Sequence, residues 1–192
     1  MKKKIFIAVA VILVIAVIAI VAFNLVKENV EQKELLEKHT VTQEQWKAAM
    51  AAENFTMSYI NVNGDEDVCK FTNEGYISSS SKYGESKYVF IGDNCYELTQ
   101  SGDTWVAKFS AKADDHRMLP WYMDIFSELV YDGEQNLYVY TDGWDTIEFK
   151  FEYGALVSMK FVTVFGDDVA ITEYFISNVG TTAITLPEYV IE

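Results

Sequence analysis

The sequence predicts an α+β fold, in which a large curved antiparallel sheet wraps around an N-terminal helix and a mid-chain helix, behind an N-terminal transmembrane helix. Three observations predict it. An unbroken apolar run extends from Ile5 to Phe23. The hydrophobic period changes to two after Asn54. One stretch among the strand-like runs, residues 120–133, is apolar around most of a helical circumference.

The apolar run has the length of a membrane span. A bilayer core needs about 20 apolar residues in a helix, and residues 5–26 meet that length with Asn24 as the one polar interruption. A cleaved signal peptide has a shorter core of about 7–15 residues before a small-x-small site. Within residues 1–26 the only such site is Ala8-Val9-Ala10, which comes too early. We therefore expect residues 1–26 to be kept as a signal anchor, with cleavage as the alternative.

The charges around this run predict its orientation. Lysines occupy residues 2–4, and positively charged flanks stay on the cytoplasmic side. The single-pass chain would then have its N-terminus in the cytoplasm and its bulk outside the cell membrane. Residues 27–39 are charged and favour helix, which predicts a juxtamembrane stalk. Residues 40–192 remain for one extracytoplasmic domain, long enough to bury a sizeable core.

The part of the chain after residue 26 is strongly acidic. It contains 29 acidic and 12 basic residues, a net charge of −17. We expect no nucleic-acid partner, because a polyanion would be repelled. Aromatic residues make up 15% of the chain and there are only 2 prolines, which indicates a folded domain rather than a disordered tail.

A short helix is predicted near the start of the domain. Thr42 and Gln45 have the spacing of a capping box. Trp46, Ala49 and Met50 then fall at positions i, i+3 and i+4, which is the apolar stripe of an amphipathic helix over about residues 43–53.

Strand-like runs fill most of the remaining chain, about six before residue 120 and about five after residue 133. Turn dipeptides separate them, including Asn63-Gly64, Asp93-Asn94 and Gly102-Asp103, and the spacing of about 8–12 residues favours an antiparallel meander. The run DTIEFKFEY, residues 145–153, alternates with one dry face, made of Ile147, Phe149, Phe151 and Tyr153.

The stretch PWYMDIFSELVYDG interrupts this pattern. Pro120 stands at a plausible first helical position and Gly133 follows the end. Few polar residues lie between them, so a helix here would need burial on several sides. We expect it to lie on the dry face of the sheet.

The order of elements resembles the LolA/LolB/LppX-type lipoprotein-carrier superfamily over residues 40–192. The resemblance rests on the helix with Trp46 before FTMSYINV, on the segment YVFIGDNCYELTQSGDTWVAKF, and on the closing SNVGTTAITLPEY. It implies a half-barrel of strands closed by helices, with an apolar cavity for the acyl chains of lipids or lipoproteins. The chain departs from the pattern, because it has no lipidation cysteine and is expected to keep its anchor. A soluble shuttle is therefore not expected.

Three function classes remain from these observations, and the third of them is an unrecognised hydrolase. The first is a membrane-anchored binding module that holds an apolar ligand such as a lipid or lipoprotein acyl chain. Its cavity would be lined by Trp121, Tyr122, Ile125, Phe126, Leu129, Phe149, Phe151, Met159, Phe161, Tyr174 and Ile176. The second is a structural or interaction ectodomain of a cell-envelope complex, in which the same side chains fill the core completely, as is usual in protein interiors.

Catalysis, metal binding and cofactors find little support in the sequence. No nucleophile elbow, zinc-binding motif or glycine-rich phosphate loop occurs. The polar cluster of residues 113–117, ADDHR, contains a histidine beside carboxylates but is typical of a solvated loop. The acidic and amide side chains of residues 61–67 are better explained by a polar hairpin than by a calcium loop. We expect neither an enzyme nor a cofactor.

The two cysteines, Cys69 and Cys95, form a candidate disulfide. An oxidising compartment outside the cell membrane would permit the bond. A simple meander places them three strands apart, roughly 14 Å at about 4.8 Å per strand, whereas a disulfide needs Cα atoms within about 7 Å. Two small buried thiols are the alternative.

Overall fold

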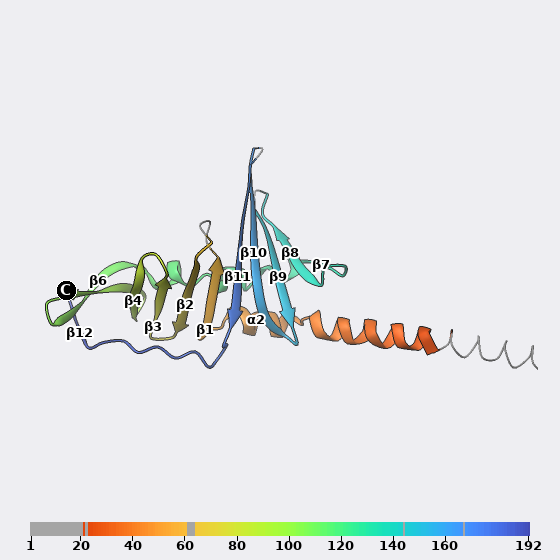
Figure 1. The fold of residues 1–192 in the computed structure, drawn as a ribbon, viewed down its shortest axis with the longest axis horizontal. Helices are drawn as coiled ribbons and strands as arrows, with labels where there is room; N and C mark the ends of the chain where they lie inside the picture. The colour runs from red at the N-terminus through yellow and green to blue at the C-terminus, as the bar shows by residue number, and fades with distance from the viewer. Residues whose placement is uncertain (1–20, 22, 61–63, 144, 167) are drawn as a thin grey trace, which may run out of the picture. The chain divides into compact units, whose positions relative to one another are not determined.

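The computed structural model describes residues 21, 23–60, 64–143, 145–166 and 168–192 (Figure 1). The chain forms two units, residues 1–38 and 39–192, and each is described by itself. The described part of the first unit is helical. Its exposed surface carries the ion pairs Lys27–Glu31, at 3.6 Å, and Lys33–Glu37, at 3.8 Å, each joining residues four positions apart on one helix face.

The predicted transmembrane helix is not found. The prediction covers residues 5–26, of which residues up to 20 and residue 22 lie outside the described part of the chain. Within the residues that the structure describes, no helix is long and apolar enough to cross a membrane.

The second unit is built on one sheet of twelve strands. Strands β1–β6 form one meander and β7–β11 a second, and the two meet where β1 pairs with β11. Neighbouring strands are antiparallel except at one edge, where β12 runs parallel to β6. The strands are β1 (Phe55–Ile60), β2 (Glu66–Thr72), β3 (Gly75–Ser80), β4 (Gly84–Ile91), β5 (Asn94–Ser101), β6 (Thr104–Lys112), β7 (Val130–Asp132), β8 (Leu137–Thr141), β9 (Asp145–Glu152), β10 (Ala155–Phe165), β11 (Asp168–Ser177) and β12 (Tyr189–Ile191).

The predicted half-barrel is wrong, because the sheet stays open. Strands β7 and β12 stand at the two ends of the strand order and do not pair with each other. Figure 1 shows the strands spread in one row, with the β10–β11 hairpin extending beyond its neighbours.

The predicted mid-chain helix is also wrong. The chain between β6 and β7 instead forms three short 3-10 turns, η1 (Ala113–His116), η2 (Leu119–Tyr122) and η3 (Ile125–Glu128), and residues 130–132 then join the sheet as β7. One physical reason is that the Tyr122 carbonyl accepts a hydrogen bond from a side chain outside the segment. The indole Nε1 of Trp46 donates to the Tyr122 carbonyl at 2.9 Å, and that carbonyl would accept from Phe126 in an α-helix. Aromatic and β-branched residues also favour helix only weakly.

The predicted amphipathic helix forms as α2 (Gln43–Met50), three residues shorter than expected. The predicted capping box is confirmed, since the Gln45 backbone donates to Thr42 Oγ1 at 3.2 Å and the Thr42 backbone donates to Gln45 Oε1 at 2.8 Å. Trp46 and Met50 are fully buried in the main core. Helix α2 lies against β10 and η2, on the face of the sheet that holds this core.

The C-terminal residues cross the sheet after β11. Figure 1 shows them running past the ends of the first meander to reach the edge beside β6. Asn54 fixes the start of this crossing, because its side chain donates to the Thr182 carbonyl at 2.8 Å and accepts from the Thr182 backbone at 2.7 Å. Farther on, Leu186 and Tyr189 pack on a second, smaller core cluster, made of Val89, Leu98 and Ala107.

Candidate functional site

The space in which the sequence predicted a cavity is largely filled. Phe149, Phe151 and Met159 have no exposed surface. The Trp46 ring lies between the two phenylalanines, with ring centroids 4.9 Å from Phe149 and 5.5 Å from Phe151. These three predicted cavity residues are therefore packed core.

The other predicted cavity residues lie around this core. Tyr122 packs edge-on against Phe149 at 5.4 Å and Phe126 lies 6.0 Å from Trp46, whereas Trp121 is 59% exposed. The half-buried members of the set that pack against the core are Tyr122, Ile125, Phe126, Leu129 and Phe161. The remaining two, Tyr174 and Ile176, do line hollows, which lie farther along the sheet.

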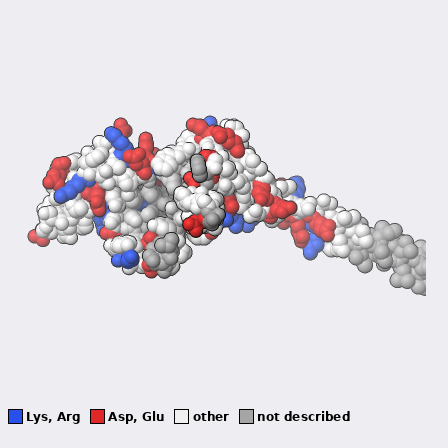
Figure 2. Space-filling view, turned by 90° about the horizontal axis from the view of Figure 1, so that it is seen from above, with Lys and Arg blue, Asp and Glu red and all other residues white. Residues whose placement is uncertain are grey.

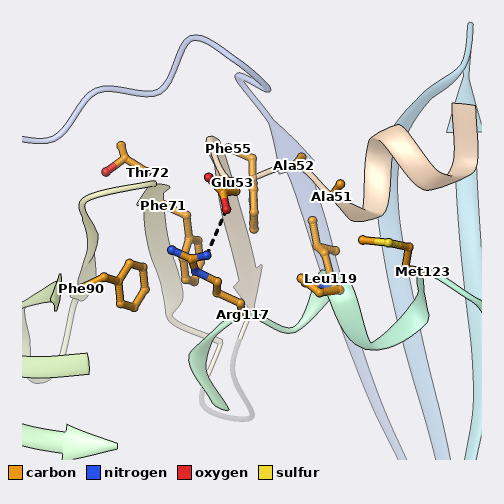
Figure 3. A pocket seen from close by; sticks show the side chains of 11 residues that line it. Ala51, Ala52, Glu53, Phe55, Phe71, Thr72, Phe90, Arg117, Leu119 and Met123 are labelled. Carbon is orange, nitrogen blue, oxygen red and sulfur yellow. Dashed lines mark hydrogen bonds and ion pairs between the residues drawn. The ribbon is translucent and has the colours of Figure 1, made fainter. Parts of the chain in front are cut away.

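The first hollow lies between the end of α2, strands β1 and β2, and the turn η2. Its volume is about 160 Å³. Figure 3 shows Arg117 reaching up between phenylalanines toward Glu53, while Leu119 and Met123 face the alanines at the end of α2. Its lining is Ala51, Ala52, Glu53, Phe55, Phe71, Thr72, Phe90, Arg117, Leu119, Pro120 and Met123.

Two further hollows adjoin the first. The second, of about 330 Å³, is lined by Phe55, Met57, Tyr59, Cys69, Phe71, Tyr76, Ser78, Tyr88, Asp115, His116, Met118, Leu119 and Tyr174. The third, of about 250 Å³, is lined by Gln45, Ala48, Ala49, Ala52, Leu119, Gly154, Ala155, Leu156, Ile176 and Val179.

Leu119 is common to all three hollows. It begins the turn η2 and is only 2% exposed. Phe55 and Phe71, which stack at 4.9 Å, also separate the first hollow from the second. The three spaces thus share a few apolar lining residues.

The second hollow has a polar corner formed by phenols and one imidazole. His116 Nδ1 and the Tyr76 hydroxyl share a hydrogen bond of 2.8 Å, and the Tyr76 ring stacks on Tyr88 at 4.3 Å. Burial raises the pKa of Tyr76, so the phenol stays neutral. His116 Nε2 is buried and has no hydrogen-bond partner among the described residues. Apolar walls with a few convergent polar groups are typical of small-molecule sites.

Alkaline pH is expected to destabilise the domain through its tyrosines. Burial, aided by Asp67, raises the pKa of Tyr59 to about 12, and burial, aided by Asp142 and Asp145, raises that of Tyr122 to about 12. Unfolded tyrosines ionise near 10, so this contribution to stability is complete below about pH 10 and is lost as pH rises toward 12. Urea unfolding between pH 8 and 12 measures it. Tyr59→Phe should make the fall shallower, and an unchanged midpoint up to pH 12 would contradict the expectation.

The candidate disulfide is not formed. Cys69 on β2 and Cys95 on β5 are free thiols, with β3 and β4 between them. Cys69 donates weakly to Ser78 Oγ at 3.5 Å, and burial raises the pKa of the Cys95 thiol to about 11. Both therefore act as small apolar side chains of the core face.

Among the residues that the structure describes, no three acidic, histidine or cysteine side chains are grouped so that they could hold a metal ion. In the ADDHR cluster, the Asp115 carboxylate accepts from the Lys112 backbone at 3.3 Å and so caps η1. The calcium alternative over residues 61–67 falls partly on residues 61–63, which lie outside the described residues.

Sequence reasoning missed most of the lining. The alternation Phe55, Met57, Tyr59 on β1 was a signal that could have indicated an inward face. Leu119 and Arg117 carried no such signal, because they lie in an irregular segment.

The opposite face of the sheet carries an exposed apolar patch. It lies on β1 and the β10–β11 hairpin, where Val164 pairs with Val169 and both point away from the core. Its members are 44–60% exposed and are Ile60, Val164, Val169, Ile171 and Phe175. Patches of this kind are typical of protein interaction sites.

Comparison with protein-family models and with curated protein sequences gives no match to this chain. The resemblance to the lipoprotein-carrier superfamily stays a prediction.

Proposed function

We propose that residues 39–192 form a binding module for an apolar ligand, which occupies the hollows around Leu119. One observation carries the proposal. Three neighbouring spaces of about 160, 330 and 250 Å³, with mainly apolar walls, meet at this single side chain. Ligand pockets are commonly 300–1,000 Å³ in volume, so the second hollow reaches that range alone and the others could extend it.

The energetics favour an apolar occupant. Each methylene group moved from water into such a space contributes about 0.8 kcal/mol. The lining of the second hollow lies mostly on regular strands, whereas helix α2, turns and loops supply most of the lining of the other two.

A binding role is proposed rather than catalysis. The imidazole of the candidate acid–base cluster is hydrogen-bonded to the phenol of Tyr76 and not to the neighbouring carboxylates of Asp114 and Asp115. The location of the domain outside the cell membrane stays a prediction, and ligand binding as proposed does not depend on it.

The test is uptake of decanol by the full chain, measured by native mass spectrometry and titration calorimetry. Leu119→Ala should merge the three hollows and raise the affinity for decanol about 15-fold, since two further buried methylene groups contribute roughly 1.6 kcal/mol. Leu119→Phe should fill the junction and weaken binding.

The matched control is Leu98→Ala. Leu98 is 4% exposed and belongs to the second core cluster, so its loss removes the same atoms at a site away from the hollows. Both alanine variants should lose about 2–5 kcal/mol of stability, but only Leu119→Ala should bind decanol more tightly. Equal affinities in the two variants, or no uptake by any of them, would refute the proposal.

Failure of this test would favour the second candidate, an interaction ectodomain with a filled core. The observation in its favour is the exposed apolar patch on β1, β10 and β11. A partner protein fits the acidic domain better than nucleic acid does.

A further inference from the structure

The first hollow has one pair of opposite charges in an otherwise uncharged lining. Arg117 and Glu53 are the only charged side chains among its lining residues. Figure 3 shows their ion pair beside the rings of Phe71 and Phe90. Arg117 is also the only arginine of the chain.

Arg117 is held in place by the protein rather than by Glu53 alone. Its guanidinium carbon lies 4.5 Å from the centre of the Phe90 ring, within the range of a cation–π interaction. Its backbone donates to the Asp114 carbonyl at 3.2 Å, which closes η1. The cation would therefore keep its position without a carboxylate partner.

The ion pair between Arg117 and Glu53 is weak enough for the carboxylate of a ligand to replace Glu53. Arg117 Nη1 donates to Glu53 Oε1 at 3.1 Å, and the Glu53 side chain is 55% exposed whereas that of Arg117 is 25% exposed. Exposed ion pairs are weak and screened by salt. This bond uses one N–H of a guanidinium that has five, and guanidinium binds a planar carboxylate through two parallel hydrogen bonds.

The rest of the domain offers an anion little attraction. Residues 39–192 contain 25 acidic and 9 basic residues, a net charge of −16. In Figure 2 the acidic side chains outnumber the basic ones on the face that is shown. The net negative charge of the domain repels anions, whereas the Arg117 guanidinium beside the apolar hollow can attract one.

We propose that the ligand of the first hollow is an amphiphile with a carboxylate head group, which binds Arg117 in place of Glu53 while its apolar chain enters the hollow. This inference rests on the proposed function and adds the head-group class. Arg117 is the residue that selects the head group, and Glu53 is a competitor that occupies the cation when no ligand is bound.

The experiment compares decanoate with decanol, two probes of equal chain length, on the full chain at neutral pH by titration calorimetry. The wild type should bind decanoate more tightly than decanol, and added salt should reduce this preference. Arg117→Met should lower decanoate affinity about tenfold and change decanol affinity much less, because decanol carries no charge. Glu53→Gln should raise decanoate affinity about threefold, since it removes the competitor. The tenfold loss is close to the lower end of the range for a hydrogen bond to a charged group, and the threefold gain is the size typical of an exposed ion pair.

Lys160→Met is the control. Lys160 forms a comparable ion pair with Glu148, at 3.0 Å, on strands β10 and β9 outside the hollows, so its loss should not change the preference. Retained decanol binding by Arg117→Met shows that this variant is folded. Equal binding of the two probes by the wild type, or equal loss of both in Arg117→Met, would overturn the inference while leaving the proposed function intact. Absence of binding by either probe would refute the proposed function itself.

Discussion

Trp46→Ala is expected to lower the free energy of unfolding by about 3–5 kcal/mol, the range for removing a large aromatic side chain from a core. Trp46 has no exposed surface. Its ring contacts Phe149 and Phe151, and its Nε1 donates to the Tyr122 carbonyl at 2.9 Å. The substitution therefore leaves a cavity and a half-buried carbonyl without its donor, and these two costs add.

Urea unfolding followed by circular dichroism measures this loss. Trp46→Phe should lose less, because it keeps an aromatic ring but leaves the Tyr122 carbonyl unsatisfied. Trp121→Ala is the matched control, since Trp121 is 59% exposed and should change stability by no more than about 0.5 kcal/mol. Similar losses for Trp46→Ala and Trp121→Ala would contradict the central position of Trp46. If the loss of the Trp46 hydrogen bond releases only residues 113–129, the urea unfolding curve of Trp46→Ala should show a second transition.

Gly75→Ala is expected to lower stability by about 3 kcal/mol, at the upper end for overpacking a well-packed interior. A Cβ atom at this position would lie 2.1 Å from the Tyr88 carbonyl oxygen and 2.9 Å from the Val89 Cα. Both atoms belong to the backbone of β4, which pairs with β3 at this point. The two strands would have to move apart, since no side-chain rotation can relieve the clash.

Gly133→Ala is the control for Gly75→Ala. A Cβ atom at Gly133 would meet only the Tyr131 side chain at 3.8 Å, an ordinary contact. Chemical unfolding of both variants should show a large loss for Gly75→Ala and a change within about 0.5 kcal/mol for Gly133→Ala. Because the added Cβ atom would push β3 and β4 apart, amide hydrogen exchange should also increase in these two strands. A Gly75→Ala protein as stable as the wild type would mean that the strands do not approach so closely.

The alternation of apolar and polar residues predicted correctly which side chains of a strand are buried, where the two faces of that strand differ in polarity. In β9, Ile147, Phe149 and Phe151 are buried as their period of two indicates. The same pattern placed Tyr153 with them, yet Tyr153 is 79% exposed with φ 51°. It stands in the turn with Gly154, where the left-handed backbone reverses the chain and ends the alternation.

The mid-chain segment could not be predicted from its composition. An apolar circumference indicates burial, but it does not distinguish an α-helix from short turns that pack on a sheet. One contact that favours the turns is the hydrogen bond from Trp46 to the Tyr122 carbonyl, between residues 76 positions apart. Contacts of this kind depend on the tertiary fold and leave no local periodicity.

The positions of the hollows also could not be predicted from local sequence patterns. Apolar side chains such as Phe149 and Leu119 look alike in a sequence, yet the first fills the core and the second stands between three spaces. The difference arises because α2 covers part of the sheet closely while the 113–129 segment covers the adjoining strands with short turns. Only the placement of these elements decides where packing is incomplete.

The C-terminal strand has a consequence for solubility. An open sheet ends in strands whose unpaired backbone groups can recruit another chain, and natural proteins keep such edges short or covered. The nine-residue β6 would be one long edge here, but the three-residue β12 covers part of it, and the Glu192 backbone donates to the Ala107 carbonyl at 3.2 Å. The other edge strand, β7, also has only three residues. By pairing with β6, strand β12 reduces the unpaired edge through which two such sheets could aggregate.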